Sequence, residues 1–164
     1  DLDILILDLP PGTGDIQLTL TQKIKMTGAI IVTTPQDIAL SDVRKGADMF
    51  RKVNTPVLGV IENMSGFQLS GKTSSPDSKI LIGNKELEID NDGNFNLNID
   101  IFKKGGGQKE SERLGVPLLG KIPLSKDIMN ATDAGNPIVI SAPDNGISKV
   151  YFSLAEKMSN IIKD

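Results

Sequence analysis

Short apolar runs alternate with amphipathic segments along the 164-residue chain. Four runs are predicted to be strands, at residues 4–7, 29–32, 57–61 and 118–122. The first is unbroken, as in a central parallel strand covered on both faces. Segments with helical spacing are predicted at residues 16–24, 38–53, 109–114 and 147–162. This alternation predicts an α/β fold, a parallel sheet with flanking helices, as a single domain over residues 1–164.

The predicted helices carry apolar stripes and end signals. Ile16, Leu20 and Ile24 recur every fourth residue, with Asp15 placed to cap that helix. The next helix is predicted to have Asp37 as its N-cap and to end at residues 54–56. The last helix bears an apolar side that we expect to pack on the core. Lys and Arg do not dominate its polar face, as they would in a membrane-surface helix. That side comprises Tyr151, Leu154, Ala155, Met158, Ile161 and Ile162.

Residues 66–102 break the strand–helix rhythm and are rich in Ser, Asn and Asp. Apolar and polar residues alternate at 79–83, 85–89 and 94–99, and the sequence NDG at 91–93 is a turn signal between the last two. We therefore predict a small antiparallel β insertion on the surface of the α/β body.

Composition narrows the chemistry. The chain has no cysteine and no histidine, and its formal net charge is −3. Disulfides, thiolate chemistry and Cys/His zinc sites are excluded, so a metal would be a hard, oxygen-bound ion such as Mg²⁺. Without clustered Lys and Arg we expect no nucleic-acid binding, and without a long apolar run no membrane span.

The string DLPPGTGD at residues 8–15 is the sharpest candidate site. A strand that ends in Asp8 places a carboxylate at the carboxyl edge of a parallel sheet, where ligands bind. Gly12 and Gly14 allow backbone N–H groups to approach an anion closely. The alternative is an ordinary strand-to-helix turn capped by Asp15.

Three glycines at 105–107, near Lys103, Lys104 and Lys109, invite comparison with a phosphate cradle. The spacing is not that of a P-loop, G-x-x-x-x-G-K-[ST]. We favour a hinge before a short helix.

The motifs together resemble the Mrp/ApbC iron–sulfur cluster carriers. These form one branch of the ParA/MinD-like P-loop NTPases (the SIMIBI class). DLPPGTGD looks like the Walker B and switch II segment of that family. The resemblance covers nearly everything outside 66–102. The other matching strings are TTPQDIAL at 33–40, GVIENMS at 59–65, GGG at 105–107, LGVPLLGKIPL at 114–124 and DAGNP at 133–137.

The resemblance implies roles for five residues. Asp8 would support Mg²⁺, through water, beside ATP. Pro11 and Gly12 would bind the nucleotide, and the backbone of Gly12 would sense the γ-phosphate. Asn63 would hydrogen-bond the adenine, and Pro123, just past a strand, would lay backbone against the base. The alternatives are a turn-forming Asn63 and a Pro123 that simply ends the strand.

Two departures from the family stand out. The family's Walker A, a glycine-rich loop with two lysines upstream of the Walker B strand, is missing, so we expect a fragment that lacks its N-terminal part and is inactive alone. Family members that carry clusters have a Cys-x-x-Cys motif after the ENMS segment. Here residues 66–71 contain no cysteine, so no ligands for a 4Fe-4S cluster are expected.

The resemblance therefore implies a cytoplasmic, Mg²⁺-dependent ATP-hydrolysing carrier or scaffold of iron–sulfur cluster assembly. It would be a homodimer when complete and would meet iron–sulfur recipient proteins. A ParA/MinD-like partition or division ATPase is one alternative. A non-enzymatic interaction module built around residues 66–102 is another.

Overall fold

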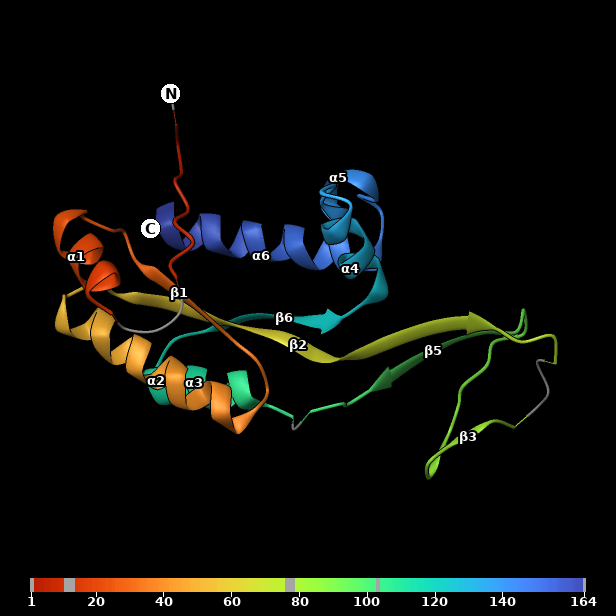
Figure 1. Cartoon of the computed structure of the whole chain (residues 1–164). Helices are drawn as coiled ribbons and strands as arrows, with labels where there is room; N and C mark the ends of the chain where they lie inside the picture. Colours follow the sequence, from red (N-terminus) through yellow and green to blue (C-terminus); the bar gives the residue numbers. More distant parts are fainter. Residues whose placement is uncertain (1, 11–13, 76–78, 103, 164) are drawn as a thin grey trace.

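The computed structural model describes residues 2–10, 14–75, 79–102 and 104–163 (Figure 1). Helices and strands alternate along most of the chain. The helices are α1 (Asp15–Lys23), α2 (Asp37–Lys52), α3 (Gly106–Leu114), α4 (Lys126–Asp133), α5 (Ile138–Ser141) and α6 (Gly146–Lys163). The strands are β1 (Ala29–Thr33), β2 (Val57–Lys72), β3 (Leu81–Ile82), β4 (Lys85–Glu86), β5 (Asn94–Ile99) and β6 (Leu118–Leu124).

The body of the protein is built on the first half of β2, which lies between β1 and β6. Both neighbours are parallel to it, with Ile31 opposite Val60 on one side and Ile122 opposite Asn63 on the other. Three of the four strands expected from the apolar runs are therefore confirmed. Parallel neighbours are joined by crossover connections, which place helices on the faces of the sheet.

Helices cover both faces of this sheet (Figure 1). On one face, α2 and α3 pack through a buried cluster that includes Ile31, Phe50 and Val60. On the other face, α6 packs through Leu154 against Ile61 and neighbouring β6 residues. The α/β class with flanking helices is thus confirmed.

The second half of β2 continues out of the body without a break in the strand. Residues 67–72 pair antiparallel with β5, in a register that sets Leu69 opposite Leu97. This two-stranded extension projects from the body in Figure 1, with the short β3–β4 pair near its tip. The turn at 91–93 is confirmed, since Ile89 bridges Phe95 on either side of it. We call residues 66–102 the arm. The antiparallel insertion was predicted, but β2 as its first strand was not.

The predicted strand at residues 4–7 is wrong. The segment is extended but pairs with no strand of the described chain, and Leu5 and Ile6 are 67% and 74% exposed. Figure 1 shows the first residues running away from the sheet. An apolar run signals a need for cover on both faces, but neighbouring strands and helices must supply that cover. In the described chain, β1 pairs along one edge with β2 and its other edge receives no strand.

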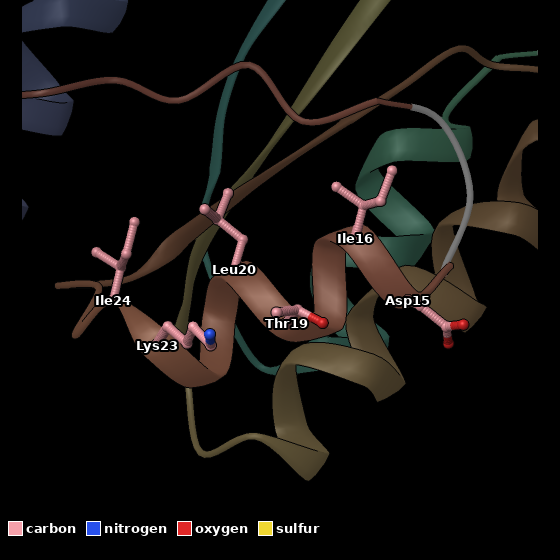
Figure 2. Close-up of a pocket in the computed structure, with 6 residues that line it drawn as sticks. All are labelled: Asp15, Ile16, Thr19, Leu20, Lys23 and Ile24. Atoms are coloured by element: carbon pink, nitrogen blue, oxygen red, sulfur yellow. The ribbon is translucent and has the colours of Figure 1, made fainter.

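The first predicted helix is confirmed as α1, but its N-cap is Gly14 rather than Asp15, and its apolar stripe does not belong to the buried core. Ile16, Leu20 and Ile24 point to one side of α1, where they line a shallow hollow of about 530 Å³ (Figure 2). The buried residues of α1 are polar, Gln17 and Thr21. They are accepted in the interior because they bond backbone carbonyls: Gln17 Nε2 donates to Pro10 O at 2.9 Å, and Thr21 Oγ1 to Gln17 O at 2.9 Å.

The predictions for the later helices agree more closely with the structure. α2 begins at Asp37 with Gln36 as its N-cap, one residue before the predicted cap, and Asn54, with φ 55°, follows its end. α3 starts three residues earlier than predicted. The core-facing stripe of α6 is confirmed for Leu154, Tyr151, Met158 and Ile161.

Candidate functional site

The carboxyl end of the parallel sheet brings two of the candidate residues together. Asn63 on β2 lies opposite Ile122 on β6, and Pro123 is the next residue along. Asn63 is half-buried and Pro123 is buried. Pro123 lies inside β6, one residue before its end, rather than beyond it. An amide and a stretch of strand backbone thus meet at the sheet edge where α/β proteins bind ligands.

Local bonds fix the backbone around Asn63. Its Oδ1 accepts a hydrogen bond from the N–H of Met64 at 2.9 Å, and Met64 has a left-handed φ of 54°. That conformation is unusual for a residue with a side chain. The donor is the next residue and not the one two residues on, so this bond is not that of a turn-forming Asn. The Nδ2 group donates to no described residue, and Oδ1 has a second lone pair. Asn63 therefore keeps both a donor and an acceptor.

Glu62 lies one residue earlier and is 1% exposed. Its Oε1 accepts from Ser65 Oγ at 2.6 Å, and its Oε2 accepts from the N–H of Gly107 at 2.6 Å. Lys121 Nζ lies 3.7 Å from Oε1. The carboxylate is thus buried with partners for both oxygens, as a buried charge requires. Sequence reasoning missed this residue, although an acidic residue that closes an apolar strand was visible at position 62.

Gly107 belongs to the first turn of α3, whose N-cap is Gly105 with φ 78°. A helix N-terminus attracts anions, and this one binds the carboxylate of Glu62. The three glycines thus lead into a short helix, as expected, and their role as a hinge stays a prediction. The Gly107 N–H group, which could have bound a phosphate, is bound by the Glu62 carboxylate instead.

The structure does not bring Asp8 to the edge of the sheet. Asp8 is exposed and belongs to the unpaired segment described above. The next two residues are held: Leu9 packs on the core and Pro10 O accepts from Gln17. Pro11 and Gly12 lie outside the described residues. The roles expected for Asp8, Pro11 and Gly12 stay predictions.

The residues present can be compared with the ligands that a metal ion or an iron–sulfur cluster requires. Nowhere in the described ranges do three or more Asp or Glu residues gather closely enough to hold a metal ion. Asp8 alone could contribute one oxygen, which suits Mg²⁺ held mainly by water and phosphate. With no cysteine in the sequence, this chain does not fit an iron–sulfur cluster bound through its own thiolates.

A second buried carboxylate lies on the same helix as Gly107. Glu110 is 1% exposed, and its Oε1 accepts from Arg113 Nε at 2.8 Å. Arg44 Nε on α2 lies 3.4 Å from Oε2. The hydrogen bonds to Glu110 raise the pKa of Arg113 above its usual value. This network joins α2 to α3 and does not involve residues 62–65.

Two further surface features frame the site. A hollow of about 770 Å³ lies between the arm and the starts of α4 and α6, and Gln68, Asn96 and Asn145 are among its lining residues. Among the helices described here, none has the length and apolar character needed to cross a bilayer.

One protein family and several known proteins are similar to this chain. The family model described as ParA, NUBPL iron-transfer P-loop NTPase, matches residues 1–86 and 81–159. A protein of Aquifex aeolicus named iron-sulfur cluster carrier protein is 42% identical over 163 residues, which is 99% of this chain and 38% of that protein. An Arabidopsis thaliana protein named iron-sulfur protein required for NADH dehydrogenase, mitochondrial, is 40% identical over 164 residues, 100% of this chain and 45% of that protein. The chain thus spans less than half the length of these relatives.

Solved structures agree with the fold. A nucleotide-binding protein of Archaeoglobus fulgidus, solved in complex with ADP, is 28% identical with a TM-score of 0.56, covering 84% of this chain and 46% of that one. The cell division ATPase MinD of Pyrococcus furiosus is 22% identical with a TM-score of 0.53, covering 82% and 43%. The second likeness concerns the fold alone.

Proposed function

Since the chain belongs to the ParA family of NUBPL-type iron-transfer P-loop NTPases, we propose that it supplies the base-recognising part of an ATP-hydrolysing protein of iron–sulfur cluster assembly. The observation that supports this proposal most directly is the meeting of Asn63 and Pro123 at the carboxyl edge of three parallel strands. An amide offers the donor and acceptor that pair with the edge of adenine. Relatives of this chain are named iron–sulfur cluster carriers, and one structural neighbour was solved with ADP.

The chain contributes only some of the groups that the reaction needs. In the hydrolysis of ATP a water attacks the γ-phosphate and ADP leaves, and positioning and electrostatics lower the barrier. Asp8 and the backbone of Gly12 would act on the phosphate side, and Asn63 with the Pro123 backbone on the base side. The pattern G-x-x-x-x-G-K-[ST] occurs at residues 66–73, but there residues 67–72 are a strand paired with β5 and not a loop that leads into a helix. The proposal therefore requires a phosphate-binding loop supplied by another part of the protein.

The cluster is cargo in this proposal. The chain offers no thiolate, so its part in assembly is nucleotide-dependent docking with proteins that hold the cluster, with the arm as the contact. A homodimer fits the family, and the compartment we propose is the cytoplasm.

Nucleotide binding and turnover test the proposal directly. In the protein that contains this chain, we expect Asn63→Ala to weaken ATP binding about tenfold, the value of one buried hydrogen bond. Asp8→Ala should slow phosphate release about 100-fold, as when one charge-stabilising group is lost. Asn160→Ala, at an exposed position of α6, is the control and should change neither. Unchanged turnover in Asp8→Ala would rule out its Mg²⁺ role.

Iron analysis tests the cargo assignment. After anaerobic reconstitution, the protein should hold no cluster through this chain, because it offers no cysteine. One cluster per dimer, retained when every cysteine elsewhere in the protein is replaced, would show that oxygen or nitrogen ligands of this chain bind it.

A further inference from the structure

The arm joins the body at two points that lie beside the base-recognition residues. Its outgoing root is residues 64–66, where Met64 takes a left-handed φ of 54° and the pairing of β2 with β6 shifts register. Its return root is residues 105–107, where Gly105 takes a φ of 78° and α3 begins. The chain therefore turns sharply at both roots, and turns of this kind hold their shape only when surrounding contacts fix them.

One side chain contacts both roots. The Glu62 carboxylate accepts from Ser65 Oγ in the outgoing root and from the Gly107 N–H in the return root, each at 2.6 Å. Lys121 Nζ on β6, 3.7 Å away, adds a third element. Because Glu62 is 1% exposed, water does not compete for these bonds.

The contact at the return root needs the carboxylate and the glycine together. Gly107 carries no Cβ, and one placed there would lie 2.7 Å from the Glu62 Cβ and 3.1 Å from Oε2. The N-cap of α3 offers no side-chain oxygen, so the helix N–H group is satisfied from β2 instead. A negative charge there also interacts favourably with the helix dipole.

The same four residues, 62–65, carry Asn63. Two bonds fold this segment: Ser65 Oγ to Glu62, and the Met64 N–H to the Asn63 side chain. The direction of the Asn63 amide is therefore set by the bulge that Glu62 closes.

We propose that Glu62 is a positioning residue that clamps residues 63–65 and the start of α3 into one unit, so that base recognition at Asn63 and the placement of the arm are coupled. This inference rests on the proposed role of Asn63. It predicts that loss of the clamp lowers discrimination between purine bases, and that nucleotide binding protects the arm roots. Coupling of this kind is reciprocal.

Glu62→Gln tests the clamp, because the amide keeps the shape but loses the charge that Gly107 and Lys121 face. The readout is the ratio of the dissociation constants for GTP and ATP, measured on the protein that contains this chain. We expect the ratio to fall about tenfold, toward the value for Asn63→Ala. The reason is that a misplaced Asn63 amide loses about one hydrogen bond that favours binding of ATP over GTP. Asn63→Ala combined with Glu62→Gln should fall no further than Asn63→Ala alone.

Glu110→Gln is the matched control. Glu110 is equally buried and also holds α3, but its partners are Arg113 and Arg44. It should lower stability yet leave the GTP/ATP ratio within about twofold of wild type, because it does not contact residues 62–65. A fall of the ratio in both variants would mean that general loosening of α3 is responsible, and would overturn the positioning role.

Hydrogen exchange supplies the second readout. ATP should slow exchange of the amides at residues 64–66 and 105–107 in wild type and in Glu110→Gln, but not in Glu62→Gln. If Glu62→Gln does not fold, Ser65→Ala removes the outgoing contact alone and should lower the ratio about threefold. An unchanged ratio in a folded Glu62 or Ser65 variant overturns the clamp while nucleotide binding stands. A wild-type protein that binds no ATP overturns the proposed function and the clamp together.

Discussion

Two glycines in helices should respond to the same substitution with opposite signs. In a helix, Gly→Ala is intrinsically favourable by about 1 kcal/mol, because glycine loses more backbone freedom on folding. Gly46 lies within α2, and a Cβ built there meets nothing within 4 Å. Gly46→Ala should therefore raise the free energy of unfolding by about 0.5–1 kcal/mol.

Gly107→Ala should be destabilising. The new Cβ would lie 2.7 Å from the Glu62 Cβ, well inside the contact distance of about 3.5–4.0 Å between carbon atoms. The Glu62 Cβ is attached to a strand paired on both sides, so it cannot move away as a flexible side-chain tip could. Overpacking of this kind costs about 1–3 kcal/mol.

The shift that relieves this clash also lengthens the bond from the Gly107 N–H to Glu62. A hydrogen bond to a charged group contributes about 1.5–3 kcal/mol, of which part is lost. After the gain of about 1 kcal/mol in helix propensity is subtracted, the net loss is about 2 kcal/mol.

Urea unfolding followed by circular dichroism measures both variants. The midpoint should move up for Gly46→Ala and down for Gly107→Ala with an unchanged slope, because neither changes the surface exposed on unfolding. A Gly107→Ala protein as stable as wild type would refute the reasoning. The close approach of α3 to Glu62 would then not require glycine, and the clamp would lose its geometric basis.

Three further changes follow from contacts in the structure. Lys157→Met should cost about 1 kcal/mol, because Lys157 Nζ donates to the backbone carbonyl of Leu119 at 2.7 Å. Arg113→Met should cost about 2 kcal/mol, because it leaves the buried Glu110 carboxylate with a single cation. Hydrogen bonds from the Asn94 side chain and backbone lower the pKa of Asp90 below 3.8. The stabilisation that Asp90 gives the turn is therefore present at neutral pH and is lost as the pH falls through that lowered value.

Each of these has its own check. Lys149→Met removes an exposed lysine from the same helix as Lys157 and should leave the urea midpoint unchanged. An equal effect at both positions would refute the carbonyl bond. For Arg113 the comparison is Arg51→Met, whose partner Asp48 is exposed, and which should cost at most about 0.5 kcal/mol. For Asp90, amide exchange at the turn should accelerate in acid, and Asp90→Ala should show that fast exchange already at neutral pH.

The part of the fold that sequence predicted well depends on local pattern. Strands β1, β2 and β6 contain short apolar runs, a signal that is visible in a few consecutive residues. α4 and α5 were not predicted. α5 has four residues, and α4 has eight with no buried side chain, so neither gives a periodic apolar signal. The cap of α4 at Ser125, which accepts from the Asp127 N–H, was the signal available.

The failure at residues 4–7 has a clear cause. An apolar run was taken to mean a buried strand, but whether such a surface is covered depends on elements distant in the chain. The apolar stripe of α1 is likewise left out of the buried core. Gln17 and Thr21 show the opposite case, since polar residues were buried by bonding to backbone carbonyls. A hydrophobicity pattern contains no information on those bonds.

The candidate site divides in the same way. Asn63 and Pro123 could be predicted because each follows a recognisable apolar run, and parallel strands present the ends of such runs at one edge of the sheet. Glu62 could not be assigned a partner, since the N–H that it binds lies 45 residues later, on the far side of the arm. What the sequence did show was a three-glycine run with no phosphate-loop spacing. The structure explains this run, because the buried Glu62 carboxylate, the start of α3 and the returning end of the arm lie within a few ångströms of one another. A carboxylate in that place excludes an external anion from the start of α3, so any phosphate that this protein binds must be held by other groups.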